Sequence, residues 1–557
     1  MKNNRELFSF YGWLLICLLI AFTCCCLIKP LVLSVDSAYG FLAYKGTLFF
    51  HAFNRVPELS ILNIAKTDAI FESWWSPGQW LVPGLLNFVF GIRLGLIAIF
   101  VTLGALVSGL LGYFRLFRFY RFPRHISLLS LLIIFSSATC YYGFVVYQGG
   151  EVLEFAVFPW FLLYVARINR LSLTNLVLTG LFFFLCFLAK TTLLLYGFIV
   201  LLARAIQLSG LTFRKINRFS MSGLWLLLPG LVCLFFIWLF FLSRGPRPSV
   251  INHFNITAMG ILTPVISPLS SILSVQQNVG RGELILKTFW NEYRIGLFSF
   301  FSYVGILLLQ VWIFQRLLKS REVDSNYRSI FFILYGGLAA FFLFAYSFGT
   351  NIDLNVRHFK LMGYLLAPAL LIVLQEKVRL FWIQWAVLFC CLLAAADIVY
   401  LKNKWTSGRY IGESYFYRNC EPIGTADPLD EPSYRQLLAI DRRLANSKGD
   451  PFVFFVESTA DIAIDLHHRY ILLTPGEDPL AKVYRGDQAI VIACISKQLL
   501  SSRKDILGKK FPDLGSFKII AETGRYWFLC SELKNRQGQA VVDEPGRYFH
   551  LKRGSRF

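Results

Sequence analysis

Long apolar runs alternate with short polar and basic segments through roughly the first 400 residues of the chain. A helix needs about 20 mainly apolar residues to cross a bilayer, because lipid cannot hydrogen-bond to an exposed backbone. By this criterion the pattern predicts about eleven transmembrane helices. They fall at about 11–31, 92–114, 126–147, 151–167, 173–208 (two helices), 222–242, 295–317, 329–349, 360–375 and 380–400. The chain is therefore predicted to be a polytopic α-helical membrane protein.

The run at 173–208 is interpreted as a hairpin of two helices. At about 1.5 Å per residue a single helix of this length would be far longer than one bilayer crossing. The polar residues Lys190, Thr191 and Thr192 interrupt the run and are the predicted turn.

Basic residues predict the orientation of these helices. They gather in alternate short loops, around 115–124, 167–170, 214–218, 316–328 and 377–379. The positive-inside rule places such loops, and the N-terminus, in the cytoplasm. Two long polar segments, 32–91 and 243–294, then lie outside the plasma (inner) membrane as outer loops. The net charge of +22 is explained largely by the cytoplasmic clusters, so no nucleic acid is expected as a partner.

The composition changes after about residue 402, and residues 402–557 are predicted to form a soluble α/β domain on the extracytoplasmic side of the membrane. Short strand-like segments alternate there with helix-like stretches, a pattern typical of α/β folds. The predicted strands are Pro451–Val456, Tyr470–Leu473, Ala489–Ala493 and Phe517–Ala521, and the predicted helices are 432–446 and 495–506. The predicted transmembrane domain is 1–401.

Overall composition agrees with this division. The chain is 56% hydrophobic and 16% charged, against roughly 45–50% and 25% in soluble proteins. A soluble enzyme is excluded by these values. The chain has no CxxC pair, so a zinc or thioredoxin-type site has no support.

Asp36 is the first candidate for chemistry, because it follows the first apolar run directly, near the predicted outer face. A carboxylate there can act as a general base on an acceptor hydroxyl. The alternative is an ordinary helix N-cap, in which Asp36 accepts hydrogen bonds from the amides that follow. Position alone favours the cap.

The second candidate is the segment from Glu72 to Trp80, which contains Trp75 and Pro77. Three tryptophans beside a Pro-Gly pair predict a helix at the membrane interface that begins at a sharp turn. The alternative is a plain belt of aromatic residues at the bilayer border.

Together these features resemble the GT-C superfamily of membrane glycosyltransferases, which includes protein O-mannosyltransferases and lipid A aminoarabinose transferases. The resemblance covers about 1–400 and rests on a short basic N-terminus, one helix, an early outer Asp36 and a later Ser76-Pro77-Gly78. Many relatives have a second acid after the first and two prolines in the later motif. Ser37 and a single proline stand at those places here.

The resemblance implies further site residues. Glu151 and Glu154 match an outer loop where a carboxylate recurs, and Lys190 matches a turn that carries Lys or Arg. Arg357 and His358 match an Arg-Tyr segment that opens a late helix. The alternatives are a polar turn for the two glutamates, a snorkelling lysine for Lys190 and interfacial anchoring for Arg357.

The implied chemistry is sugar transfer from a polyprenyl-phosphate donor to a lipid, glycan or protein acceptor on the outer membrane face. Asp36 would deprotonate the acceptor hydroxyl, and Lys190, Arg357 and His358 would neutralise the lipid phosphate. Glu151 or Glu154 would position donor or acceptor, and Trp75 and Pro77 would belong to the substrate-binding segment. No obligatory cofactor or metal is expected, although Asp36 and Glu151 could hold a divalent cation.

Two other functions are compatible with the sequence. A transporter or flippase of a lipid-linked glycan would need charged residues inside several membrane helices, and broken helices near the midplane. A non-catalytic membrane scaffold would bind a partner through its outer α/β domain, and the loop with Asp36 and 74–78 would then be dispensable.

Overall fold

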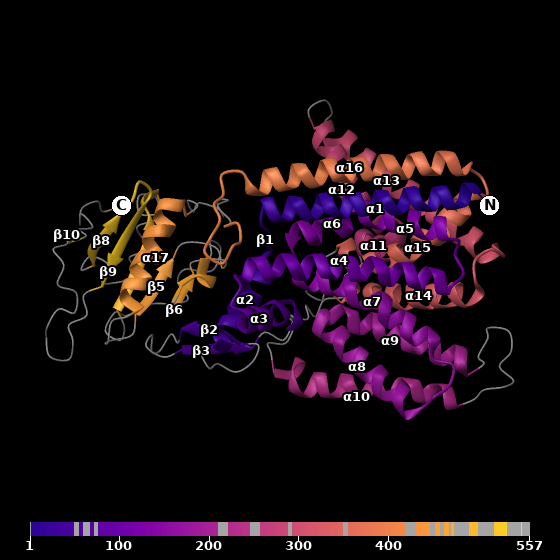
Figure 1. Ribbon diagram of the computed structural model, residues 1–557, viewed down its shortest axis with the longest axis horizontal. Coiled ribbons are helices and arrows are strands. Elements are labelled where there is room, and N and C mark those ends of the chain that lie inside the picture. Colours follow the sequence, from indigo (N-terminus) through magenta and orange to yellow (C-terminus); the bar gives the residue numbers. More distant parts are fainter. Residues whose placement is uncertain are drawn as a thin grey trace. The chain divides into compact units, whose positions relative to one another are not determined.

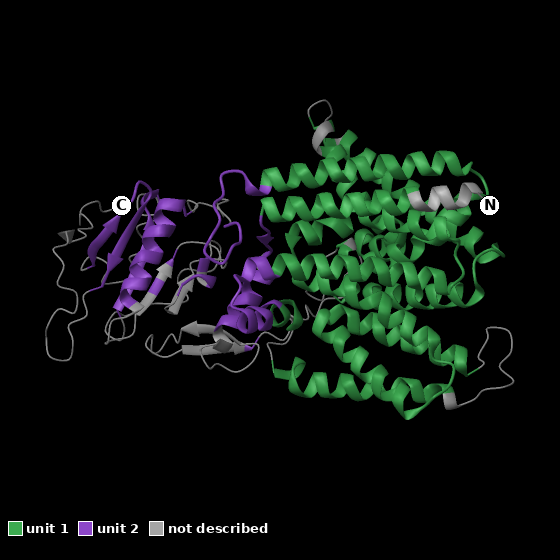
Figure 2. Ribbon diagram, in the orientation of Figure 1, with its two compact units in different colours: residues 1–29, 73–82, 98–404 green, residues 30–72, 83–97, 405–557 purple. Residues whose placement is uncertain are grey.

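The structure is a computed structural model that describes residues 2–48, 55–59, 67–71, 76–209, 221–244, 257–287, 292–348, 355–418, 429–445, 452–456, 462–466, 469–472, 490–498, 517–531 and 547–548. The chain forms two compact units, which are coloured separately in Figure 2. The first unit comprises 1–29, 73–82 and 98–404, and the second comprises 30–72, 83–97 and 405–557. Each unit is described by itself.

The first unit is built from helices (Figure 1). Its long apolar helices are α1 (Lys2–Ile28), α4 (Leu94–Phe119), α7 (Gly149–Arg167), α9 (Thr191–Leu208), α10 (Leu227–Phe240), α13 (Glu292–Lys319), α14 (Ser325–Ser347), α15 (Lys360–Gln375) and α16 (Leu380–Thr406). Its other helices are α5 (Arg124–Ser136), α6 (Ala138–Val145), α8 (Leu173–Ala189), α11 (Ala258–Ile272) and α12 (Val275–Leu286), with short 3-10 turns at η1 (Met221–Leu226), η2 (Leu242–Arg244) and η3 (Val356–Phe359). The helix α3 (Gly78–Phe90) begins in the first unit and ends in the second.

These helices confirm the prediction of a polytopic membrane protein. Among the described residues, nine helical segments are long and apolar enough to cross a membrane, or up to eleven if each of two bent pairs is one span. Large apolar side chains such as Trp385, Phe389 and Leu392 remain exposed on α16. Exposure of this kind suits a helix surrounded by lipid rather than by water.

The hairpin predicted around Lys190 is present. The apolar run forms α8 and α9, which pack against each other. Lys190 separates them because its backbone is extended, with φ −163° and ψ 135°. Ser172 begins α8 by accepting a hydrogen bond from the Asn175 amide at 3.2 Å, which is an ordinary N-cap.

The prediction of 243–294 as one polar outer segment is wrong for residues 258–286, which form α11 and α12 with a bend of 91° between them. α11 packs against α15, and its serines and prolines are buried. These residues lowered the apparent hydrophobicity of the segment. Two of the serine hydroxyls are satisfied within the helix, because Ser267 and Ser271 donate to the carbonyls of Pro264 and Pro268 at 2.8 and 3.1 Å. A second bend of 56° separates α5 from α6.

The second unit contains the helix α2 (Val35–Leu48) and a six-stranded mixed sheet. The sheet order is β10-β8-β9-β7-β5-β6. Its strands are β5 (Phe452–Val456), β6 (Arg469–Leu472), β7 (Ile490–Ser496), β8 (Lys518–Glu522), β9 (Tyr526–Cys530) and β10 (Arg547–Tyr548). The short strands outside this sheet are β1 (Val32–Leu33), β2 (Arg55–Leu59), β3 (Thr67–Phe71) and, in the first unit, β4 (Val146–Tyr147), and β2 pairs with β3 in antiparallel register.

All four predicted strands of the C-terminal region are found, and the predicted helix at 432–446 is α17 (Glu431–Ala445). β5 pairs in parallel with both β6 and β7, whereas β9 runs antiparallel to β7 and β8. The prediction of a helix at 495–506 is wrong at its start, because Ile495 and Ser496 end β7, and residues 499–506 lie outside the described part.

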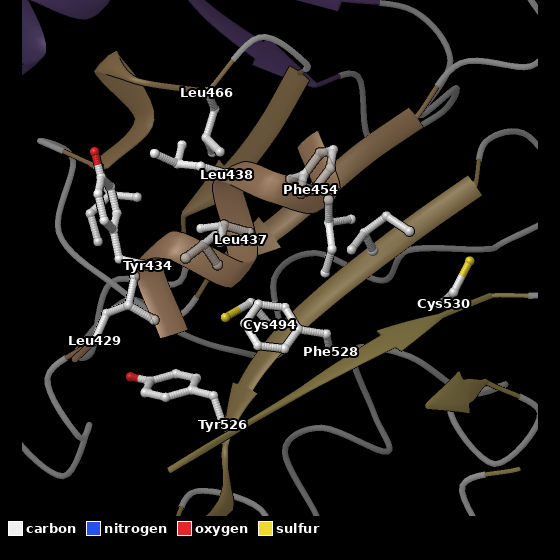
Figure 3. Packing of buried hydrophobic residues seen from close by; sticks show 14 of the residues in the cluster. Leu429, Tyr434, Leu437, Leu438, Phe454, Leu466, Cys494, Tyr526, Phe528 and Cys530 are labelled. Atoms are coloured by element: carbon white, nitrogen blue, oxygen red, sulfur yellow. The ribbon is translucent and has the colours of Figure 1, made fainter. Parts of the chain in front are cut away.

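The core of this sheet lies beneath α17 (Figure 3). Leu437 and Leu438 of α17 contact a layer that includes Phe454 and Phe528, all almost fully buried. Burying each such side chain contributes about 1.5–3 kcal/mol. The C-terminal region therefore has a hydrophobic core of its own.

The second unit also joins segments that are far apart in sequence. The Tyr417 amide donates to the Leu31 carbonyl at 3.1 Å, and the Gly95 amide donates to the Ser414 carbonyl at 2.7 Å. The rings of Phe41 and Phe416 lie 5.6 Å apart. The helix that carries Asp36 thus packs with the chain that follows α16. The predicted boundary at residue 401 separates these segments, whereas the structure places them in one unit.

Candidate functional site

Four charged side chains from three distant segments meet in the first unit: Glu151 and Glu154 of α7, Lys190 between α8 and α9, and Lys360 of α15. Lys190 Nζ lies 2.5 Å from Glu151 Oε1 and 3.0 Å from Glu154 Oε2. Lys360 Nζ forms an ion pair with Glu151 Oε2 and lies 3.5 Å from Glu154 Oε2. We call these four residues the charge cluster.

The charge cluster is buried but balanced. Side-chain exposure is 16% for Lys190, 8% for Glu151, 4% for Lys360 and 1% for Glu154. A charge without a partner at this depth would be very costly, so two carboxylates and two ammonium groups hold one another in place. Glu154 Oε1 accepts no hydrogen bond from the described residues. It is the one carboxylate oxygen of the cluster without a hydrogen-bond partner among the described residues.

Helix ends position all four groups. Glu151 lies in the first turn of α7, and Glu154 follows three residues later on the same face. Lys190 is the residue that precedes α9, and Lys360 is the first residue of α15. Three helices therefore begin at the cluster, and each N-terminus adds partial positive charge. This agrees with the predicted topology, in which the three helices begin on the same face.

The turn at 76–79 adjoins the same region. Ser76 Oγ lies 2.9 Å from Thr191 Oγ1, at the start of α9. Tyr147 donates its hydroxyl hydrogen to the Gln79 carbonyl at 2.8 Å. Pro77 is buried in this turn. The Pro-Gly segment singled out in the sequence therefore lies beside the turns at 147–151 and 190–191, whereas Trp75 lies outside the described residues.

Gly78 makes the close approach possible. A β-carbon at this position would lie well inside van der Waals distance of the Leu188 carbonyl. Gly78→Ala should therefore push the 76–79 turn away from the α8–α9 joint at a cost of about 1–3 kcal/mol. We expect a lower thermal midpoint of the purified protein. Gly104→Ala is the matched control, because nothing lies within 4 Å of its added carbon. An equal midpoint for the two variants would contradict this packing.

Arg357 and His358 lie in η3, directly before Lys360. Asn355 Oδ1 accepts a hydrogen bond from the Arg357 amide at 2.9 Å, which fixes the start of the turn. His358 is buried, its ring stacks on Phe342 at 5.6 Å, and its carbonyl accepts the Tyr196 hydroxyl at 2.7 Å. Arg357 is half-buried. Both residues therefore lie in the turn that directly precedes Lys360 and positions it in the charge cluster.

Lys360 is the site residue that the sequence interpretation missed. It follows the Arg357-His358-Phe359 segment that was singled out, and it opens a helix buried along almost its whole length. A lysine at the start of a buried helix must have a partner, because an isolated ammonium group is not tolerated there. That signal was available in the sequence, but its two glutamate partners are more than 200 residues away.

Asp36 lies in the second unit, in the first turn of α2, and is exposed. The helix is capped by Ser34, whose hydroxyl accepts the Ser37 amide at 3.3 Å. The N-cap interpretation of Asp36 is therefore wrong, because Ser34 is the residue that caps α2. Its role as a general base stays a prediction.

A second buried ionic network lies in the same unit as Asp36. Arg418 pairs with Asp465, which also accepts the Tyr434 hydroxyl hydrogen, and Arg418 Nη2 donates to Ser414 Oγ at 2.9 Å. Arg418 and Asp465 are almost fully buried. This network fixes the chain after α16 to the sheet region.

Lys45 of α2 is electrostatically coupled to this network, and burial lowers its pKa to about 8. The carboxylates of Asp441 and Asp465 raise that pKa, whereas the Arg418 guanidinium lowers it further. The unfolded chain keeps the Lys45 proton up to about pH 10.4. The native state therefore gains stability as the pH rises from about 8 to about 10.4, because the unfolded state binds more protons in this range. The thermal midpoint of Lys45→Met should therefore exceed that of the wild type by the largest amount below pH 8. The advantage should shrink by pH 10, and a constant difference across this range would contradict the shift.

Metal ligands are not grouped in the ranges that the structure describes. No set of three or more His, Cys, Asp or Glu side chains there is arranged to hold a metal ion. Asp36 and Glu151, the pair considered from the sequence, belong to different units. Metal dependence stays a prediction.

Comparison with known proteins identifies similar solved structures only. No family model matches the chain, and no curated protein matches it. ArnT from Cupriavidus metallidurans bound to undecaprenyl phosphate is 10% identical, with a TM-score of 0.44 over 93% of this chain and 98% of that one. The apo form of ArnT is 9% identical, with a TM-score of 0.42 over 94% of this chain and 98% of that one. Arabinofuranosyltransferase AftD from Mycobacteria is 12% identical, with a TM-score of 0.46 over 92% of this chain and 39% of that one.

All three similarities have TM-scores below 0.5, so no class is carried over from these structures. Identities of 12% or less carry no residue role from them to this chain. The roles considered below rest on this chain's own residues.

Proposed function

We propose that the chain is a membrane glycosyltransferase that moves a sugar from a polyprenyl-phosphate donor to an acceptor hydroxyl on the outer membrane face. The observation that carries the proposal is the convergence of separate motif segments. The turn at 76–79, Glu151 with Glu154, Lys190 and the 357–360 turn are far apart in sequence and meet in the first unit. The family resemblance rests on the same segments, with the exception of Lys360.

The charge cluster suits a lipid phosphate as leaving group. Lys190 and Lys360 are the only two cations of the cluster, and each is already oriented by glutamates. Three helix N-termini add favourable potential for an anion, as at other phosphate sites. The two ammonium groups are already held by glutamates, and the helix dipoles are fixed. The site therefore needs little reorganisation when negative charge develops on the leaving phosphate oxygen.

The proposed reaction is a displacement at the anomeric carbon. The acceptor hydroxyl oxygen forms the new bond to that carbon as the bond to the phosphate oxygen breaks. The hydroxyl proton passes to a base, which we assign to Asp36, and the polyprenyl phosphate leaves with the bonding electrons. Glu154, through Oε1, is assigned to a donor sugar hydroxyl. The acceptor is a lipid, glycan or protein.

Transport of a lipid-linked glycan is the second candidate, because two of its requirements are observed. Glu151, Glu154 and Lys360 lie within candidate membrane spans, and α5–α6 and α11–α12 are bent pairs. The location of the charges favours transfer. Glu151, Lys190 and Lys360 lie at helix beginnings, at the border expected for outer-face chemistry rather than along a path through the bilayer.

Proteoliposomes containing a panel of polyprenyl-phosphate sugars distinguish the two functions. Transferase activity predicts release of polyprenyl phosphate and a covalent sugar adduct on added acceptor lipids, glycans or peptides, detected by mass spectrometry. Transport predicts intact donor that becomes accessible on the opposite leaflet. Movement of intact donor without any adduct would overturn the proposal, and Lys190→Gln should abolish the adduct while leaving the protein inserted.

A further inference from the structure

A groove of about 790 Å³ runs along one side of α16 in the first unit. Its lining on α16 extends from Trp382 to Tyr400, which corresponds to about 27 Å of helix at 1.5 Å per residue. This is nearly the thickness of the hydrocarbon core of a bilayer, about 30 Å. Leu370 and Leu374 of α15 form part of the opposite wall. Most of the groove is therefore suited to an extended apolar chain.

The groove has one distinctly charged region. Arg281 of α12 donates from Nη2 to Asp397 Oδ1 and Oδ2, at 2.7 and 2.6 Å. Tyr141 also donates its hydroxyl hydrogen to Asp397. The Arg281 side chain is 49% exposed, against 10% for Asp397. About half of the Arg281 side chain therefore remains exposed beside the ion pair, where a ligand can reach the guanidinium group.

We propose that this groove binds an aminophospholipid, with an acyl chain along α16 and the head group at Arg281 and Asp397. The phosphate would accept hydrogen bonds from the remaining Arg281 donors, for which the planar guanidinium is well suited. The primary ammonium group would lie against the Asp397 carboxylate. Burial of the acyl chain supplies the apolar part of the affinity.

Charge complementarity selects this lipid over a purely anionic one. A polyprenyl phosphate or a phosphatidylglycerol would meet Arg281 but would also face the negative Asp397 at short range. A head group that carries both charges pairs with both residues. The groove is also distinct from the charge cluster: both use α15, but Lys360 begins this helix, whereas the groove residues Leu370 and Leu374 lie near its end.

Native mass spectrometry of the delipidated full-length protein tests the assignment. Phosphatidylethanolamine, phosphatidylglycerol and a polyprenyl phosphate are titrated separately. We expect phosphatidylethanolamine to bind at least about tenfold more tightly than the other two, because only it adds a charged pair with Asp397. Equal affinity for the three lipids would overturn the proposal.

Variants separate the head-group contacts from the apolar groove. Asp397→Asn should weaken phosphatidylethanolamine binding and tighten phosphatidylglycerol binding, because it removes the negative charge that faces the anionic head group, whereas Arg281→Gln should weaken both. Ala386→Trp should fill the groove and reduce phosphatidylethanolamine binding without touching the ion pair. Leu392→Trp, on the exposed surface of α16 and outside the groove lining, is its matched control. Equal binding by the two tryptophan variants would place the lipid elsewhere and overturn the proposal.

Discussion

Replacing Lys360 by methionine is expected to destabilise the first unit by about 3–5 kcal/mol, the range seen when one partner of a buried ion pair is removed. Lys360 is almost fully buried between Glu151 and Glu154. Without it, two carboxylates share Lys190 alone, and the cluster carries an uncompensated negative charge. The thermal midpoint of the purified protein in detergent should fall markedly, and the yield of folded protein should fall with it.

A charge-balanced double variant tests whether charge, rather than packing, causes this loss. Glu151→Gln combined with Lys360→Met leaves one carboxylate and one ammonium group, Glu154 and Lys190, which lie 3.0 Å apart. The double variant should be more stable than Lys360→Met alone, because nearby residues of one network are not additive. Lys319→Met at the exposed end of α13 should change stability little. A double variant less stable than the single one would contradict the electrostatic explanation.

Asp36→Asn is expected to reduce sugar transfer by about 10²–10⁴, the usual contribution of a general base. The substitution keeps the shape of the side chain and removes its ability to accept a proton. Folding should be nearly unaffected, because Asp36 is exposed and Ser34 provides the cap of α2. The favourable contact of an acid with the helix N-terminus, which is lost, contributes about 0.3–1 kcal/mol.

The control for this variant is Asp68→Asn, which removes another carboxylate from the same segment between α1 and α3 and should retain activity. The comparison uses initial rates of polyprenyl-phosphate release, normalised to folded protein. Equal rates for Asp36→Asn and the wild type would exclude Asp36 as the base while leaving the charge cluster as a site. Equal losses in both variants would indicate a general effect of loop charge.

The sequence was informative wherever a single local pattern determines structure. Apolar runs of bilayer length located the long membrane helices, and a lysine with two threonines located the α8–α9 joint. Short β-branched and aromatic runs located four strands of the C-terminal sheet. Each of these signals comes from residues within a single helix or strand. It can therefore be read without knowing which distant residues pack against that element.

The failures share a physical cause, which is dependence on distant partners. α11 was hidden because its serines are polar, whereas in the structure Ser267 and Ser271 hydrogen-bond to their own helix and α11 packs against α15. Lys360 was missed because its partners belong to α7. The strand β9 was missed because Tyr526–Cys530 becomes a strand through pairing with β7 and β8 on either side.

Most residues of the site could be predicted from the sequence, but the contacts between them could not. The resemblance selected Glu151, Glu154 and Lys190 for separate roles, one positioning a substrate and another neutralising phosphate. In the structure they contact one another directly. Lys190 is therefore neither a simple snorkelling residue nor an unpaired cation waiting for phosphate. Its ammonium group is held by carboxylates, and a bound phosphate would have to share it.

The most direct measurement is a cryo-electron microscopy structure of the protein with bound polyprenyl phosphate. We expect the phosphate within about 3 Å, hydrogen-bond distance, of Lys190, Lys360 or the first amides of α9. Its isoprenoid chain should leave the cluster toward the membrane, while the groove along α16 holds a different lipid. A phosphate bound at Arg281, or no phosphate near the charge cluster at saturating ligand, would contradict the assignment of this cluster as the donor site.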